Sequence, residues 1–216
     1  MDTLAARRQM VDQQIRTWEV LDPRVLDALS AVPREAFVPA EYAELAFADA
    51  PIPIGFGHSM LAPKLQGRIL QALGVRSTDS VLEIGSGTGY MSACLALLGA
   101  STHSIDIHSE FIAISRENLH NVPGASVHFE IRDAFDAASL NEYDVIAVTG
   151  SMPVYDTRFE RSLRVGGRLF ATVGAAPVMD AVLIRRVDSN EWTRESLFET
   201  VIEPLINATA RPAFVF

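Results

Sequence analysis

Cysteine is almost absent from the sequence, since Cys94 is the only one in 216 residues. One cysteine excludes an intrachain disulfide and a zinc site made of cysteines alone. The N-terminal residues MDTLAARRQMVDQQIR lack the apolar core and cleavage site of a secretory signal. We therefore expect a protein of the reducing cytoplasm, in which Cys94, between apolar neighbours, belongs to the core.

Positive charge and long apolar runs are also scarce. Lys and Arg number 18 against 27 Asp and Glu, which gives a net charge of −9. An acidic chain lacks the electrostatic attraction to phosphate that nucleic-acid binding needs, and an anionic membrane surface repels it. The apolar stretch at 90–100 is too short to span a bilayer. We therefore expect neither a nucleic-acid partner nor a membrane partner.

The chain does have enough apolar sequence for one globular domain. Hydrophobic residues make up 49% of the 216, and chains of this length typically fold as a single domain. Within residues 1–216 we expect a helical cover with loops at 1–78 and a sheet at 79–216. In the cover, Asp22-Pro23 and Pro63 are typical helix starts, and Gly74 is a typical helix end.

Short apolar runs alternate with helical patterns from residue 79 onward. Strands are predicted at 80–84, 101–107, 127–131, 143–149 and 168–173, and helices at 90–98, 110–121 and 155–164. This alternation is typical of an α/β fold with a doubly wound, mostly parallel sheet. The runs at 181–187 and 195–202, joined by Asp188-Ser189-Asn190, predict an antiparallel strand pair near the end.

Three closely spaced glycines follow the first of these strands. Gly85, Gly87 and Gly89 lie in the sequence VLEIGSGTGY, between a buried strand and a helix. Glycine permits a tight turn and lets the backbone approach a ligand closely. In a doubly wound sheet such a turn lies at the carboxyl end of the strand, where ligands bind.

Two cofactor classes could use this loop. A dinucleotide site has the spacing G-x-G-x-x-G and places a pyrophosphate at the helix N-terminus, whereas the spacing here is G-x-G-x-G. Glu83 precedes the loop, and a carboxylate there repels phosphate but suits the cationic amino group of S-adenosylmethionine. Asp106 ends the next strand, where an acid can bind ribose hydroxyls, and Asp133 after the third strand can reach adenine. These acids favour S-adenosylmethionine over a dinucleotide.

Several motifs together carry a resemblance to a known family. They are MVDQQI at 10–15, VPREAFVP at 32–39, DAPIPIGFG at 49–57, the glycine loop, GGRL at 166–169 and EPL at 203–205. Over nearly the whole chain they resemble the protein-L-isoaspartate O-methyltransferase family, within the class I S-adenosylmethionine-dependent methyltransferases. The resemblance implies a seven-stranded, Rossmann-like doubly wound sheet with an antiparallel strand near its end.

The resemblance also implies a reaction and a site. Members of the family transfer a methyl group from S-adenosylmethionine, leaving S-adenosylhomocysteine, to the free α-carboxylate of isoaspartyl residues in damaged proteins, which is a repair reaction. The substrate loop would then lie within 1–78 and the cofactor on the sheet within 79–216. The residues implied to contact the cofactor are Glu83, Gly85, Ser86, Gly87, Thr88, Gly89, Asp106, Ile107, Asp133, Ala134 and Thr149.

The acceptor side departs from the family pattern. Where the family reads Gln-Thr-Ile-Ser, this chain has His58-Ser59-Met60-Leu61, so Leu61 stands at the family's active-site serine. A carboxylate acceptor is already ionised at neutral pH and needs no general base. Ser59 or His58 could orient it, and both are candidate catalytic residues. A phenol or alcohol acceptor would need a base, and His58 is then the first candidate.

Three alternatives stay open beside an isoaspartyl methyltransferase. The chain could methylate a different acceptor, such as a small molecule, or it could bind S-adenosylmethionine without catalysis. An NAD-dependent oxidoreductase is disfavoured by the glycine spacing and by Glu83. No convincing metal-ligand spacing connects His103, His108, His120 and His128, so we expect structural roles for them and no metal site.

Overall fold

A seven-stranded sheet organises the computed structural model, which describes residues 3–99, 101–136 and 142–210. The strands lie in the order β5 (Val127–Ile131), β4 (Ser101–Asp106), β3 (Ser80–Ile84), β6 (Tyr143–Met152), β7 (Leu163–Ala175), β8 (Val178–Asp188) and β9 (Glu191–Thr200). The first five run parallel to one another, and β8 runs antiparallel to both β7 and β9. The predicted mostly parallel sheet with an antiparallel pair near its end is confirmed.

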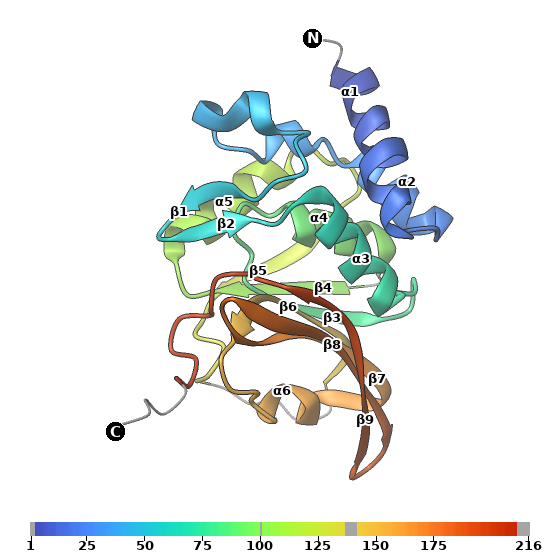
Figure 1. Cartoon of the computed structure of the whole chain (residues 1–216), viewed down its shortest axis with the longest axis vertical. Coiled ribbons are helices and arrows are strands. Elements are labelled where there is room, and N and C mark those ends of the chain that lie inside the picture. Colours follow the sequence, from blue (N-terminus) through green and yellow to red (C-terminus); the bar gives the residue numbers. More distant parts are fainter. Residues whose placement is uncertain (1–2, 100, 137–141, 211–216) are drawn as a thin grey trace.

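Helices cover the two faces of this sheet unequally (Figure 1). On one side lie α1 (Thr3–Met10), α2 (Pro23–Ala31), α3 (Pro63–Leu73), α4 (Tyr90–Leu98) and α5 (Ser109–Leu119), and on the other lies α6 (Arg158–Arg161). A buried apolar cluster fills each side of the sheet. Cys94 belongs to the larger cluster, and burial raises the pKa of its thiol to about 12. Its predicted place in the core is therefore confirmed.

The helix ends of the cover follow local sequence chemistry. The Asp22 carboxylate accepts a hydrogen bond from the Arg24 backbone N–H at 2.9 Å, and Pro23 occupies the first turn of α2. Pro63 likewise begins α3, which ends at Gly74 in the left-handed conformation. Both predicted helices are confirmed. Both begin where predicted, and α3 ends where predicted, because caps of these types satisfy the free backbone groups at helix ends.

The helix predicted at 155–164 is wrong in length. Only Arg158–Arg161 form α6, a single turn. Leu163 already belongs to β7, where it pairs with Tyr143 at the start of β6. Hydrogen bonds of a buried strand ladder outweigh a weak local helical pattern at this point, so β7 begins earlier than its apolar run indicates.

A small hairpin stands apart from the main sheet. β1 (Ile52–Gly55) and β2 (His58–Met60) pair antiparallel, with Ile52 opposite Met60. The turn at Gly55-Phe56-Gly57 has positive φ at all three residues. The motif at 49–57 thus contributes the first strand and the turn of a hairpin, and Figure 1 shows this hairpin beside α5.

Arg34 connects three segments next to this hairpin. Its side chain is fully buried. It donates hydrogen bonds to the carbonyl oxygens of Ala46 at 2.8 Å and Leu61 at 2.9 Å, and to the side-chain oxygen of Gln66. The guanidinium also lies 5.1 Å from the centroid of the Tyr90 ring. Arg34 therefore fixes the chain that leaves β2 against α3 and α4.

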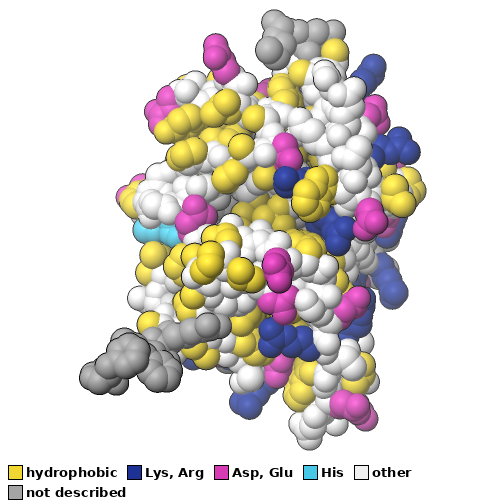
Figure 2. Space-filling model, viewed as in Figure 1, with side chains coloured by type: hydrophobic (Ala, Val, Ile, Leu, Met, Phe, Trp, Pro, Cys, Tyr) yellow, Lys and Arg dark blue, Asp and Glu magenta, His cyan; other side chains and the backbone are white. Residues whose placement is uncertain are grey.

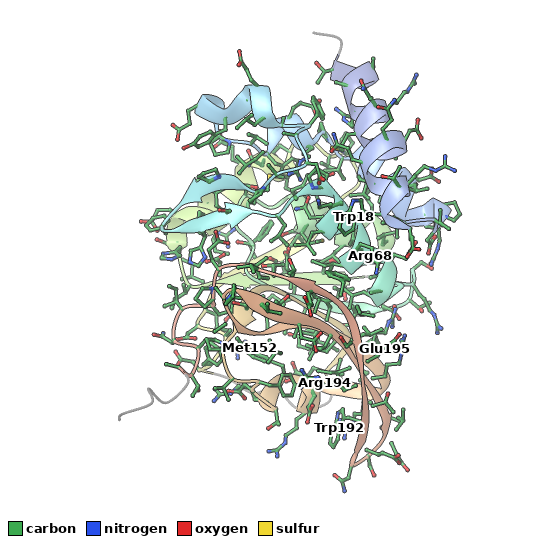
Figure 3. The ribbon with its side chains drawn as sticks, in the orientation of Figure 1. Trp18, Arg68, Met152, Trp192, Arg194 and Glu195 are labelled. Atoms are coloured by element: carbon green, nitrogen blue, oxygen red, sulfur yellow. The ribbon has the colours of Figure 1, made fainter. Side chains whose placement is uncertain are left out.

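Hydrogen bonds between residues distant in sequence hold the N-terminal segment on α3 and the last strand on α6. Arg68 of α3 donates from Nη1 to the carbonyl oxygen of Trp18 at 3.2 Å (Figure 3). Trp192 of β9 donates from Nε1 to the carbonyl oxygen of Glu160 at 3.1 Å, which holds the edge strand on α6. The N-terminal segment and the last strand are therefore held by hydrogen bonds as well as by apolar contact.

Charge is mixed on the molecular surface. Figure 2 shows acidic and basic side chains interspersed over the face that it draws. No helix among residues 3–99, 101–136 and 142–210 combines the length and the apolar character that crossing a membrane requires.

Candidate functional site

A pocket opens at the carboxyl ends of β3, β4 and β6, next to the β1–β2 hairpin. It encloses about 880 Å³ of space that protein atoms do not fill, part of it open to solvent. Its walls come from the glycine loop, from the ends of β4 and β6, and from residues 132–134, 58–61 and 203–206. Ligands of doubly wound sheets bind at this position.

Two glycines of the loop are required by their surroundings. Gly85 has a φ of +95°, and a Cβ there would lie 2.4 Å from the hydroxyl oxygen of Thr149. Gly89 has a φ of +88°, and a Cβ there would lie 3.0 Å from the backbone of Ser115. The first glycine allows β3 to meet β6 at the pocket, and the second allows α4 to begin against α5.

Asp106 lines the pocket at the end of β4 and supports the glycine loop. Its Oδ2 accepts hydrogen bonds from the Gly87 backbone N–H at 3.1 Å and from the Ser86 hydroxyl at 3.3 Å. Its Oδ1 accepts one from the His108 backbone N–H at 3.0 Å. Each carboxylate oxygen has two lone-pair directions, so Oδ1 can accept a further bond from a ligand hydroxyl.

Asp133 lies across the pocket, beyond β5. Its Oδ1 accepts a hydrogen bond from the Phe135 backbone N–H at 2.8 Å, which fixes the turn after the strand. Its Oδ2 accepts one from the Asn207 side-chain amide at 2.6 Å. The carboxylate therefore ties the C-terminal segment to this wall and presents an acceptor of the kind that an adenine amino group can use.

Glu83 lies behind the pocket and does not line it. Its side chain is fully buried, and its Oε2 accepts hydrogen bonds from the hydroxyls of Ser92 and Ser104. Its Oε1 has no hydrogen-bond partner in the described part of the chain. Burial raises the pKa of Glu83 to about 8, although the two serine hydroxyls favour the charged form. β3 turns the Glu83 side chain toward α4, so a contact between Glu83 and the cofactor stays a prediction.

The hairpin side of the pocket carries the polar groups Ser59 and Glu203. The Ser59 hydroxyl donates a hydrogen bond to Glu203 Oε1 at 2.9 Å, and both residues line the pocket together with His58 and Leu61. Leu61 is 7% exposed and offers only an apolar surface and its backbone. This end of the pocket therefore carries the Ser59 hydroxyl and a carboxylate next to an apolar side chain.

The segment that carries Glu203 is fixed to the end of β6. The Ser151 backbone N–H donates to the Glu203 carbonyl at 2.9 Å, and the Leu205 N–H donates to the Ser151 carbonyl at 2.9 Å. The Ser151 hydroxyl adds a bond to the Ile202 carbonyl at 2.9 Å. A Cβ at Gly150 would lie 2.7 Å from the Leu205 side chain, so glycine allows this close approach.

Aromatic rings surround the outer edge of the pocket. Phe56, at the turn of the hairpin, stacks on His108 with ring centroids 4.2 Å apart and meets Phe111 edge-on at 5.3 Å. The His58 ring lies 6.0 Å from that of His108. Phe56 is 53% exposed, so it belongs to the surface near the pocket and not to the core.

Comparison with known proteins agrees with this arrangement. The model of the protein-L-isoaspartate(D-aspartate) O-methyltransferase family matches residues 5–209. This chain belongs to that family. The match includes the N-terminal cover, the hairpin and the C-terminal segment, so it extends beyond the glycine loop that many methyltransferases share.

Individual relatives support the same assignment. A protein-L-isoaspartate O-methyltransferase of Koribacter versatilis is 34% identical over 201 residues, which are 93% of this chain and 90% of the relative. One of Methanoregula boonei is 35% identical over 201 residues, 93% and 92% of the two chains. A Plasmodium falciparum structure assigned to the same enzyme, in complex with S-adenosyl-L-homocysteine, has a TM-score of 0.81 at 16% identity, covering 92% and 97%. The last comparison supports the fold.

Family membership confirms the predicted resemblance and the enzyme class, a methyltransferase. It also confirms the predicted cofactor, because the family transfers methyl groups from S-adenosylmethionine. The alternative of an NAD-dependent oxidoreductase is therefore set aside.

The structure brings most of the predicted site residues of this methyltransferase into one pocket. The lining includes His58, Ser59, Gly85, Ser86, Gly87, Thr88, Asp106, Ile107, Asp133, Ala134 and Thr149. Glu83 and Gly89 lie behind this wall, against α4 and α5. That any of these residues contacts a bound cofactor stays a prediction.

Sequence reasoning missed two charged groups of the pocket, Glu203 and Arg132. Glu203 appeared only as part of the motif EPL, with no role. It meets Ser59 across 144 residues of sequence, and only the pairing of its segment with β6 brings the two together. Arg132 follows β5 directly, so its place next to Asp133 was the available signal.

Proposed function

We propose that this chain transfers the methyl group of S-adenosylmethionine to the free α-carboxylate of isoaspartyl residues in damaged proteins or peptides. One observation carries the proposal: a single pocket joins the glycine loop and Asp106 to the hairpin residues His58 and Ser59. A donor and an acceptor can therefore meet in one enclosed space. We also propose that residues 1–216 act as one domain, with 1–78 as cover and acceptor loop, and that the chain repairs proteins in the cytoplasm.

The cofactor side of the proposal rests on groups of matching chemistry. Bound S-adenosylmethionine supplies a methyl group on a sulfonium centre, which an oxygen nucleophile can take. Asp106 would accept hydrogen bonds from ribose hydroxyls, and Asp133 would accept one from the adenine amino group. Gly85 and Gly87 leave room at the pocket wall for a ligand that lies close to the backbone. Glu83 supports the loop from behind through Ser92 and Ser104.

The acceptor side would act by position and by exclusion of water. A carboxylate with an ordinary pKa near 4 is ionised at neutral pH, so no residue has to remove a proton. Holding nucleophile and electrophile in line can lower the barrier by several kcal/mol, on the order of 7–11 in well-oriented cases. Met60 and Leu61 give this end an apolar wall, and Ser59 and His58 offer polar atoms that could orient a carboxylate.

A second candidate is an acceptor without negative charge, and Glu203 favours it. Its carboxylate lies in the pocket and accepts a hydrogen bond from the Ser59 hydroxyl at 2.9 Å. A carboxylate acceptor placed beside Glu203 would be repelled. A neutral hydroxyl or amide-bearing acceptor would instead find a hydrogen-bond acceptor in Glu203. The different-acceptor alternative is therefore kept.

The proposed acceptor is tested with a pair of peptides of one sequence, differing only in an isoaspartyl or an ordinary aspartyl linkage. We expect base-labile methyl transfer from labelled S-adenosylmethionine to the isoaspartyl peptide and none to its partner. A titration of S-adenosylmethionine runs beside the assay. Binding without methylation of either peptide would overturn the isoaspartyl acceptor while leaving the cofactor site standing.

The variant Leu61→Ser separates the remaining alternatives, since it places a hydroxyl at the family's serine position. Turnover of the isoaspartyl peptide that rises in this variant supports the proposed acceptor. If the wild type methylates a component of a metabolite extract and Leu61→Ser does not improve that reaction, the different-acceptor candidate is supported. Cofactor binding with no transfer to any protein or metabolite fraction supports a non-catalytic role.

A further inference from the structure

Two histidines and a glutamate gather on the sheet at a distance from the methyltransferase pocket. His103 of β4 lies directly opposite His128 of β5 in the strand register, and Glu130 lies two residues further along β5. In a strand, residues two apart point to the same face, so all three side chains share one face of the sheet. None of the three lines the pocket described above.

The ligand atoms of these three residues lie within 4.8 Å of one another. His103 Nε2 and Glu130 Oε2 are 2.9 Å apart, and the rings of His103 and His128 have centroids 4.9 Å apart. Ligand atoms of a tetrahedral zinc site are about 3.3 Å apart at bond lengths near 2.0 Å. His128 is exposed, so its ring has room to change rotamer toward the other two ligands.

A second residue orients the central histidine. The Tyr143 hydroxyl, from β6, lies 2.9 Å from His103 Nδ1. If His103 carries its proton on Nδ1 and donates it to Tyr143, Nε2 is left with a free lone pair that faces Glu130. Metal-bound histidines commonly use their other ring nitrogen in this way, which fixes the tautomer and the direction of the ligand atom.

We propose that His103, His128 and Glu130 form a binding site for a divalent transition-metal ion, zinc above all. Two imidazole nitrogens and one carboxylate oxygen are a donor set that zinc prefers, with water in the fourth position. The ion joins the edge strand β5 to β4. The sequence gives no sign of the site, because its ligands come from two strands and their spacing follows from strand register and not from a motif.

One neighbouring cation opposes the ion. Arg132 Nη1 lies 3.7 Å from Glu130 Oε2. Arg132 is partly exposed and also lines the methyltransferase pocket, so its side chain can turn toward solvent when Glu130 binds a metal ion. Because of this competition we expect micromolar and not tighter affinity.

The proposal is tested by a calorimetric titration of Zn²⁺ into the tag-free chain of residues 1–216. We expect one Zn²⁺ per chain, and His128→Ala should weaken binding at least tenfold. His120→Ala is the matched control, because His120 is an exposed histidine at the end of α5, outside the cluster. It should bind Zn²⁺ as the wild type does.

Two further measurements keep the result unambiguous. Co²⁺ in the site should give the strong visible absorption of a tetrahedral ion, and Glu130→Gln should remove it in a chain whose circular dichroism is unchanged. Tyr143→Phe should weaken Zn²⁺ binding about tenfold through loss of the orienting bond. Absence of stoichiometric binding, or equal losses in His128→Ala and His120→Ala, would overturn the proposal.

Discussion

At the scale of single residues, Glu83 is held behind the pocket by hydrogen bonds from two serine hydroxyls. The glycine-loop acid was predicted to attract the cationic end of the cofactor. In the structure it is buried against Ser92 and Ser104, and burial raises its pKa to about 8. A carboxyl that is largely protonated at neutral pH supports the loop by hydrogen bonds and contributes little charge to the pocket.

The variant Glu83→Gln tests this assignment through the pH dependence of stability. The folded-state pKa of about 8 exceeds the ordinary value of 4.5. The contribution of the protonated carboxyl to the free energy of unfolding is therefore complete below about pH 4.5 and is lost as the pH rises through 8. Glutamine does not titrate, so the free energy of unfolding of Glu83→Gln should rise by about 4 kcal/mol relative to that of the wild type between pH 5 and pH 9.

Chemical denaturation of both proteins at pH 5, 7 and 9 measures this difference. Other titrating groups are common to the two chains and cancel in the comparison. A difference that stays constant over the range would mean that Glu83 is ionised in the folded protein at neutral pH.

Glu203 is the residue by which we expect the pocket to discriminate acceptors by charge. Glu203→Gln keeps a hydrogen-bond acceptor for Ser59 and removes the negative charge. If the acceptor is a carboxylate, its KM should fall about tenfold, since weakened repulsion of about 1.4 kcal/mol corresponds to that factor. Steady-state kinetics with the isoaspartyl peptide measures the change.

Glu195→Gln is the control for overall charge. Glu195 is an exposed carboxylate on β9 and does not line the pocket (Figure 3). The KM of Glu195→Gln for the isoaspartyl peptide should match that of the wild type. Equal KM values for Glu203→Gln and Glu195→Gln would show that Glu203 does not face the acceptor.

At the scale of elements, the β1–β2 hairpin depends on a buried arginine for its position. Arg34 holds the chain after β2 by the Leu61 carbonyl and holds α3 by Gln66, and both of these residues line the pocket. The segment around Arg34 was singled out in the sequence only as a motif. Its physical use is to satisfy carbonyl groups that the hairpin would otherwise bury without partners.

Arg34→Met should therefore cost stability and disturb the pocket together. Methionine fills similar space but leaves two carbonyl groups and one amide oxygen without a donor. We expect a loss of about 3 kcal/mol, or roughly 6–12 °C in Tm. Arg8→Met, at an exposed position of α1, should have a negligible effect. Similar Tm values for the two variants would contradict this role of Arg34.

The elements themselves were predictable where local chemistry and burial agree. The strands at 80–84 and 127–131 and the helix at 90–98 have the predicted bounds, because an apolar run and its turn residues mark them. The helix at 155–164 was overestimated, since pairing between Leu163 and Tyr143 is a non-local interaction. For the same reason the Ser59–Glu203 contact and the His103–His128 pair could not be foreseen from spacing.

At the scale of the whole molecule, the N-terminal helices, the hairpin and the sheet share one core. The larger apolar cluster contains Met10 and Leu29 of the cover, Leu61 beside the hairpin, and Val145 and Phe170 of the sheet. A ligand that joins the hairpin to the ends of the strands should therefore stabilise the fold as a unit.

Thermal unfolding tests this coupling and the cofactor class in one experiment. S-adenosylhomocysteine at about one hundred times its Kd should stabilise the folded chain by about 2.7 kcal/mol, which is roughly 5–10 °C in Tm. NAD at the same concentration should leave the Tm unchanged. A Tm that rises with NAD and not with S-adenosylhomocysteine would contradict the assignment of the glycine loop.

A crystal structure of the chain with S-adenosylhomocysteine tests the central claim most directly, namely that this pocket holds the methyl donor next to the hairpin. We predict that the ribose hydroxyls bind Asp106, that the adenine lies beside Asp133, and that the sulfur faces Ser59 and Leu61. A ligand bound elsewhere, or one whose sulfur points away from the hairpin, would contradict the account.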